Sequence, residues 1–235
     1  MRVGGFETKG AAVHIGPRKQ VWNMRMSNPK CKANHWYSVR NQSLALFARE
    51  AGFDLAMYLQ YGKAVQTELR KRAVKSALEA IDDECDSQDC PIYDIGKGVY
   101  VISLSNPLSI KYIKHYSQVI YIGRGNIMGR IKSHFELKLF DFMLSLSGAD
   151  FDFHFSYPTN TGHGAKTADV NVEHLMLNYF EAQYGSFPIL NKNAGTEKNQ
   201  AVRSNWWKKH LRASGGRPKW KLEPTKHGEF PTLDS

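Results

Sequence analysis

The sequence predicts an α+β fold, in which a small sheet is flanked by helices. Three short segments rich in β-branched and aromatic residues, at 98–104, 119–123 and 151–157, are expected to be its strands. Apolar residues recur at helical spacing before and after them, above all at 41–83 and 168–184. With 235 residues, 42% hydrophobic and 23% charged, the chain can bury a full core.

Residues 1–95 are expected to form a polar N-terminal arm and a helical region. In that region two helices are separated by Gly52, Asp54 is placed to cap the second, and a third is expected at about 64–81. An acidic stretch at 82–89 is expected to end the helices and to mark a domain boundary.

Residues 96–195 are expected to form a compact module that contains all three strands. The stretch between the first two strands is expected to be a loop, and it is too long for a tight hairpin turn. A helical stretch is expected at 126–146, and phenylalanines alternate with polar residues in the third strand, which buries one of its faces. The module then continues in a strong helix at 168–184, which Gly185 is placed to cap.

Charge and cysteine content indicate the kind of partner and the cellular compartment to expect. A net charge of +10 favours a polyanionic partner. The chain shows neither a secretory signal at its start nor an apolar run of the roughly 20 residues that span a bilayer, so a cytoplasmic protein is expected. Three cysteines make no disulfide framework, in agreement with a reducing compartment. A structural zinc held by Cys31, His35, Cys85 and Cys90 is the less favoured alternative to three ordinary thiols.

The chemistry is indicated by an ordered set of short motifs. Gly98-Val99-Tyr100 lies in the first strand and Tyr121-Ile122-Gly123 in the second, so each strand carries a tyrosine close to a glycine. Arg130 and His134 follow at a spacing that puts them on one face of a helix. A guanidinium in that position suits the oxygens of a phosphoryl group. An acid-bearing helix and Pro188-Ile189-Leu190-Asn191 complete the order.

This order of motifs resembles the GIY-YIG nuclease family over roughly residues 97–192. The resemblance implies a three-stranded antiparallel sheet flanked by helices. It also implies one Mg²⁺ or Mn²⁺ ion, bound by Glu173, for which Glu181 is the rival, and an asparagine that braces the site. The catalytic set that it carries over is Tyr100, Tyr121, Arg130, His134, Glu173 and Asn191.

The mechanism implied by the resemblance is single-metal hydrolysis of a phosphodiester. Tyr100 would take a proton from the attacking water, which requires Arg130 and the metal to lower its pKa. Tyr121 would orient the water or bind a phosphate oxygen. His134 would assist Tyr100, and it is the alternative general base.

Residues 196–235 form a basic tail in which tryptophans are interleaved with lysines and arginines. Such a segment suits contact with DNA, and docking of the tryptophans on the core is an equally weighted alternative. The residues expected to contact DNA are Arg124, Arg203, Lys208, Lys209, Arg212, Arg217 and Lys219.

The function expected from these features is that of a metal-dependent endonuclease on double-stranded DNA, most like the site-specific restriction enzymes of the family. Such an enzyme could act as a homodimer on a palindromic DNA site, with residues 1–95 as a candidate recognition region. A homing or mobile-element nuclease is the alternative, and a DNA-binding protein that does not cleave is the alternative of another class. Neither a membrane partner nor a small-molecule cofactor is expected.

Overall fold

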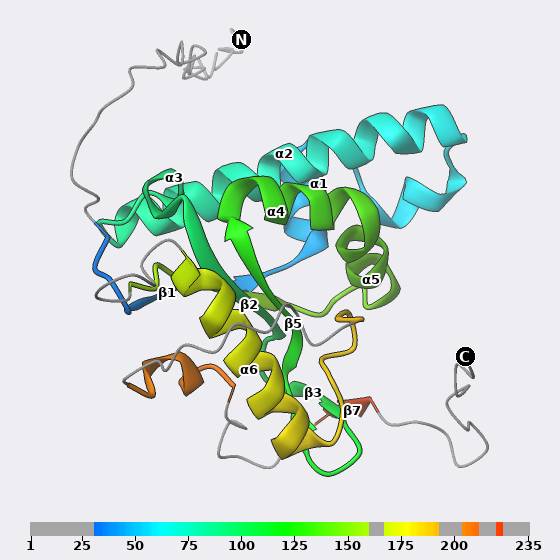
Figure 1. Ribbon diagram of the computed structural model, residues 1–235. Coiled ribbons are helices and arrows are strands. Elements are labelled where there is room, and N and C mark those ends of the chain that lie inside the picture. The colour runs from blue at the N-terminus through cyan, green and yellow to red at the C-terminus, as the bar shows by residue number, and fades with distance from the viewer. Residues whose placement is uncertain (1–30, 160–166, 193–203, 212–219, 223–235) are drawn as a thin grey trace, which may run out of the picture.

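The computed structural model describes residues 31–159, 167–192, 204–211 and 220–222. Its fold is α+β, with a sheet enclosed between helices on both faces (Figure 1). The elements are β1 (Trp36–Gln42), α1 (Leu44–Glu50), the 3₁₀ helix η1 (Leu55–Gln60), α2 (Lys63–Ser87), α3 (Ile92–Ile95), β2 (Lys97–Leu104), β3 (Leu108–Lys111), β4 (Tyr116–Ser117), β5 (Val119–Asn126), α4 (Ile127–His134), the π-helical turn η2 (Phe135–Leu139), α5 (Phe140–Ser145), β6 (Phe151–Ser156), α6 (Ala168–Tyr184), the 3₁₀ helix η4 (Trp206–Lys208) and β7 (Trp220–Leu222).

The main sheet has four antiparallel strands in the order β1-β6-β2-β5. The three predicted strands are confirmed as β2, β5 and β6, but the prediction of a three-stranded sheet was wrong because β1 adds a fourth. Trp36, Tyr37 and Val39 are buried in β1. The partner strand of β1 lies more than a hundred residues later, so no local pattern in the sequence indicated the pairing.

The stretch between β2 and β5, predicted as a loop, contains two short strands. β3 pairs with β4 in an antiparallel hairpin and with β7 in a parallel arrangement, so a second sheet has the order β4-β3-β7. β7 comes from the C-terminal tail. This part of the tail is therefore joined by backbone pairing to the segment between β2 and β5.

The helices of the N-terminal region differ from the prediction in length. The Asp54 side chain caps the second helix as expected, by accepting a hydrogen bond from Ala56 N, but that helix is the 3₁₀ helix η1. α2 continues to Ser87, so the helix does end within the acidic stretch, but its predicted end near residue 81 was wrong. Ile81 and Cys85 lie one turn apart and are both buried, and this packing continues the helix past the acidic side chains.

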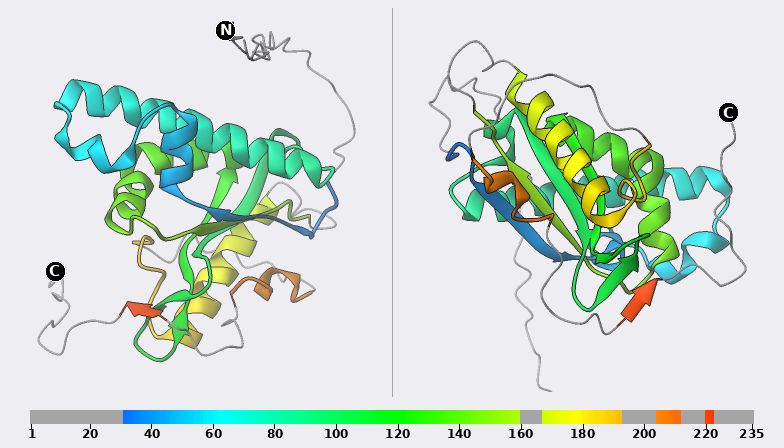
Figure 2. Two further views of the ribbon diagram at one scale, coloured as in Figure 1. Left: turned by 180° about the vertical axis from the view of Figure 1, so that it is seen from behind. Right: turned by 60° about the horizontal axis from the view of Figure 1, so that its bottom comes forward.

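Two helical layers enclose the sheet (Figures 1 and 2). α1, α2, α4 and α5 lie on one face, and α6 crosses the other face over β2 and β5. On the first face Phe135 packs between Phe47 and Phe153, at ring-centroid distances of 6.0 and 5.9 Å. Residues on both sides of the proposed boundary near residue 95 contribute to this one sheet and to one hydrophobic core.

The cysteines correct a second prediction. Cys31 and Cys90 are joined in a disulfide, and Cys85 is a buried free thiol. The expectation of three ordinary thiols was therefore wrong, and the zinc alternative loses two of its four ligands to the disulfide. The cysteines no longer favour a reducing compartment. No helix in the described ranges has the length and apolar character needed to cross a bilayer.

Candidate active site

The two predicted tyrosines meet on the face of the sheet that α4 covers. Tyr100 in β2 lies directly opposite Gly123 in β5, and the rings of Tyr100 and Tyr121 are 5.7 Å apart. A Cβ atom on residue 123 would lie 2.6 Å from the hydroxyl of Tyr100 and 2.5 Å from a ring carbon of Tyr121. The glycine of the second tripeptide is therefore what allows both rings to share this space.

α4 brings His134 and Arg130 to the tyrosines. Its N-terminus is capped by Asn126, whose side-chain oxygen accepts a hydrogen bond from Gly129 N at 2.9 Å. The His134 ring lies 4.2 Å from that of Tyr121 and 6.0 Å from that of Tyr100. Arg130 lies close enough to both phenols for its charge to lower their pKa values.

Burial sets the protonation state of this cluster. Tyr100 is fully buried, and burial raises its pKa well above the usual range, with Tyr121 adding to the rise and Arg130 opposing it. Burial is also the main reason why the pKa of His134 falls to about 4, and the charges of Arg130 and Lys138 lower it further. At neutral pH the imidazole is thus uncharged and the Tyr100 phenol keeps its proton.

One buried polar atom of the cluster lacks a hydrogen-bond partner, Nε2 of His134, within the part of the chain that the structure describes. The Tyr100 hydroxyl beside it makes no hydrogen bond of regular geometry, although Tyr121 and Arg130 lie close enough to it to shift its pKa. Buried polar groups are usually satisfied, by protein or by water. Nε2 of His134 therefore indicates a place for a water molecule or another polar group.

Glu173 approaches from the other face of the sheet, on α6. Its Oε2 accepts a hydrogen bond from Nε of Arg124 at 2.8 Å, and Nη1 of Arg124 lies 3.5 Å from Oδ2 of Asp169. The two carboxylate side chains are only 14% and 8% exposed. Burial raises the pKa of Glu173, while Arg124 and Arg130 lower it and Asp169 raises it again.

Arg124, which was expected to contact DNA, is paired with two carboxylates in this structure. The arrangement also separates the two candidate glutamates. Glu181 is exposed on α6, two turns beyond Glu173, whereas Glu173 lies within electrostatic reach of Arg130 and Tyr121. The geometry thus groups Glu173, and not Glu181, with the tyrosines.

The predicted residues surround the outer edge of β5. Side chains alternate along a strand, so Tyr121 and Gly123 face α4 while Ile122 and Arg124 face α6. Asn191 holds this edge, because its side-chain amide bonds both the N–H and the C=O of Ile122, at 2.9 and 2.7 Å. The bracing role expected for Asn191 thus has a direct counterpart in the hydrogen bonds.

Two residues that lie near the site were not identified from the sequence. Asp169 precedes Glu173 by one helical turn, and this spacing could have indicated that the two carboxylates lie on the same face of the helix. Lys138 follows His134 at the same spacing. Its Nζ donates a hydrogen bond to the carbonyl of Leu190 at 2.7 Å and lies 5.6 Å from the centre of the Tyr121 ring.

The described part of the tail is docked on the core. Trp36 Nε1 donates to the carbonyl of Trp206 at 3.0 Å, and buried Trp207 packs edge-on against Tyr179. Trp206 and Trp207 are therefore docked on the core, as one of the two alternatives expected. Lys208 lies over the Tyr179 ring and Lys209 is exposed. The other predicted contacts of the tail lie outside the described residues: Arg203, Arg212, Arg217 and Lys219.

The carboxylates of Asp169 and Glu173 are hard oxygen ligands, which suit Mg²⁺ or Mn²⁺. Arg124 contacts Oε2 of Glu173, which leaves Oε1 outside this ion pair. No group of three or more His, Cys, Asp or Glu residues converges in the described segments. A cation bound here would therefore complete its coordination with water and phosphate oxygens, as Mg²⁺ commonly does.

Comparison with known proteins identified no family model, no curated protein and no solved structure that matches the chain. The functional assignment therefore depends on the geometry of the site and on the order of the motifs.

Proposed function

We propose that the protein is a metal-dependent endonuclease that hydrolyses phosphodiester bonds in double-stranded DNA, with a GIY-YIG-like active site. The observation that carries the proposal is the meeting of Tyr100, Tyr121 and Arg130 with neutral His134, beside Glu173. Nε2 of His134 has no hydrogen-bond partner among the described residues. In this proposal β6, β2 and β5 correspond to the three-stranded sheet of the family, and β1 is an addition. The net charge of +10 suits the substrate.

The protonation states of His134 and Tyr100 favour different chemical roles for these two side chains. Nε2 of uncharged His134 is available at neutral pH to accept the proton that the attacking water gives up. The Tyr100 phenol keeps its proton, so it is better suited to donate a hydrogen bond than to act as base. Arg130 would bind the phosphoryl oxygens and stabilise the charge that develops on them.

Glu173 and Asp169 would hold the Mg²⁺ or Mn²⁺ ion. When bound, the ion polarises the phosphoryl group and stabilises the leaving oxygen. Arg124 pairs with both carboxylates in the state seen here, and it would have to give up part of that contact to the ion. In the absence of metal the guanidinium thus offsets part of the negative charge of two largely buried carboxylates.

The site-specific restriction type is favoured over the homing type because the flanking segments pack against the same sheet and core. β1 extends the main sheet, and Trp206 and Trp207 dock on the core. A homing nuclease usually carries a separable DNA-binding region, and these segments share the sheet and core of the catalytic half.

Incubation with supercoiled plasmid tests the proposal. In Mg²⁺ the wild-type protein is expected to give discrete fragments, and in EDTA none. Glu173→Gln is expected to abolish cleavage, while Glu181→Gln, an exposed position on the same helix, retains it. A plasmid that stays intact but is retarded in a gel would instead support the DNA-binding protein that does not cleave. Equal cleavage by both variants would refute the assignment of Glu173.

A further inference from the structure

Two cationic side chains lie beside Tyr121, and a third, that of Lys192, lies within electrostatic reach of Lys138. Lys138 lies 5.6 Å from the centre of the Tyr121 ring, Arg130 faces the Tyr121 hydroxyl, and Lys192 directly follows Asn191, which is fixed on β5. Burial and the charges of Lys192 and Arg130 lower the pKa of Lys138. No carboxylate forms a salt bridge with any of the three among the described residues. Like charges held together without an acidic partner indicate a site for an anion.

A local distortion of the helix brings Lys138 to this place. Residues Phe135–Leu139 form a π-helical turn between α4 and α5. Such turns insert an extra residue into a helix and are frequent at functional sites. Phe135 and Leu139 are buried at its ends, while Lys138 reaches across to the carbonyl of Leu190. The turn therefore places a lysine between His134 and the segment that braces β5.

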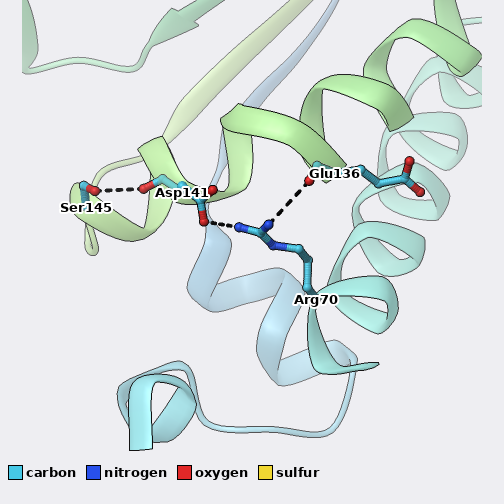
Figure 3. Close-up of polar contacts among 4 residues, drawn as sticks. All are labelled: Arg70, Glu136, Asp141 and Ser145. Carbon is cyan, nitrogen blue, oxygen red and sulfur yellow. Dashed lines mark hydrogen bonds and ion pairs between the residues drawn. The ribbon is translucent and has the colours of Figure 1, made fainter. Parts of the chain in front are cut away.

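Arg70 of α2 holds the π-helical turn from its outer side (Figure 3). Its Nη1 donates to the carbonyl of Glu136 at 3.4 Å, its Nη2 is paired with the Asp141 carboxylate, and its guanidinium lies 4.5 Å from the centre of the Phe140 ring. These contacts fix a conformation that regular helical hydrogen bonding would not favour. The N-terminal helical region thus supports the position of Lys138 without touching the site.

We propose that Lys138 and Lys192 form a second phosphate-binding subsite, which takes a phosphate of the DNA backbone next to the one that is cleaved. The proposal rests on the proposed function for the identity of its ligand. Arg130 serves the scissile phosphate, and the two lysines lie along the Leu190–Lys192 segment beside it. An ammonium group is a compact, rotatable donor that binds phosphate without demanding one orientation. A polymeric substrate always presents such a neighbouring phosphate.

The competing explanation is that Lys138 only caps the Leu190 carbonyl. The two explanations differ in the salt dependence of DNA binding, since each phosphate contact adds about 0.9 to the slope of log K against log salt. A purely structural lysine would affect stability but leave this slope unchanged.

The experiment is a fluorescence-anisotropy titration of a labelled duplex oligonucleotide with full-length protein in EDTA, at several KCl concentrations. Lys138→Gln and Lys192→Gln are each expected to bind about tenfold more weakly and to reduce the slope by about one. Lys138→Arg is expected to keep both. Lys132→Gln is the matched control, because Lys132 lies on α4 but is exposed and paired with Glu136.

The outcomes separate this proposal from the proposed function. Unchanged slopes in both glutamine variants, or an equal loss in Lys132→Gln, would overturn the subsite. If the wild-type protein does not cut plasmid in Mg²⁺ but the slopes fall as expected, the endonuclease proposal fails and the subsite stands as a DNA contact. If the wild-type protein binds no duplex at all, both proposals are wrong.

Discussion

Asn191 satisfies both backbone groups of Ile122 with one side-chain amide. Ile122 lies between Tyr121 and Gly123 on an edge strand, where unpaired backbone groups would otherwise be open to solvent or to another strand. Leu190 N adds a third bond to this edge, to the carbonyl of Ile120 at 3.0 Å. The Pro-x-x-Asn segment thus pairs with β5 in place of a further strand, and it leaves the end of β5 near Arg124 open for the site.

Asn191→Asp tests this brace. A carboxylate of the same shape cannot donate to the carbonyl of Ile122, and it places a charge where the N–H donor was. We expect a loss of about 1–3 kcal/mol in the free energy of unfolding, measured with urea at pH 7. Asn178→Asp, on the exposed side of α6, is the control and should change stability much less. Equal effects at the two positions would show that the Asn191 amide does not brace β5.

The sequence predicted the elements whose cause is local. The strands β2, β5 and β6 carry dense β-branched and aromatic runs, and Gly185 ends α6 in the left-handed conformation, with φ 82°. β1 was missed because its pairing with β6 is long-range and its residues alternate poorly. The predicted α2 is too short because the acidic side chains of 82–89 resemble a helix end, whereas burial of Ile81 and Cys85 continues the helix to Ser87.

In the candidate site, too, the features with a local cause were predicted and those that depend on long-range packing were not. Spacing along a helix was enough to group Arg130 with His134, and order along the chain was enough to nominate Glu173. The ion pair of Arg124 with Asp169 and Glu173 depends on how α6 crosses β5, which no local pattern specifies. Lys138 was missed because a π-helical turn, held by Arg70 from another helix, determines where its side chain points.

The depressed pKa of His134 predicts a pH-dependent stability. The unfolded imidazole takes up a proton as the pH falls below about 6.5, whereas the folded one does so only near 4. The unfolded state thus binds more protons in this window, so stability falls as the pH drops from about 6.5 to 4. For His134 alone the loss is about 3 kcal/mol when complete.

His134→Gln is expected to reduce that fall, measured by urea unfolding at pH 7 and pH 5. The fall will not disappear, because stacked His154 and His210, with ring centroids 3.8 Å apart, have pKa values of about 3 and about 2 and act in the same direction. An identical pH dependence in wild type and variant would show that His134 titrates normally in the folded protein.

The cysteines predict a specific labelling pattern. Burial raises the pKa of the Cys85 thiol to about 12, so the folded protein should not react with iodoacetamide at pH 8. In urea without reductant one thiol should react, and with reductant three, as counted by mass spectrometry. Reduction is also expected to lower the free energy of unfolding by about 2–4 kcal/mol, because the disulfide closes a long loop between Cys31 and Cys90. Three reactive thiols in urea without reductant would contradict the disulfide.

The ion pair between Arg124 and Glu173 predicts a stability that depends on metal. Without metal, Arg124→Gln leaves the largely buried carboxylates of Glu173 and Asp169 without their cation, so we expect a lower melting temperature than wild type in EDTA. With Mg²⁺ the ion takes over that role and no longer competes with a guanidinium. The rise in melting temperature on adding Mg²⁺ should therefore be larger in Arg124→Gln than in wild type. Glu173→Gln is expected to lose the rise, and Glu181→Gln, exposed on the same helix, to keep it. Since this readout needs no DNA, a Mg²⁺ response that survives in Glu173→Gln would place the cation elsewhere whatever the protein cleaves.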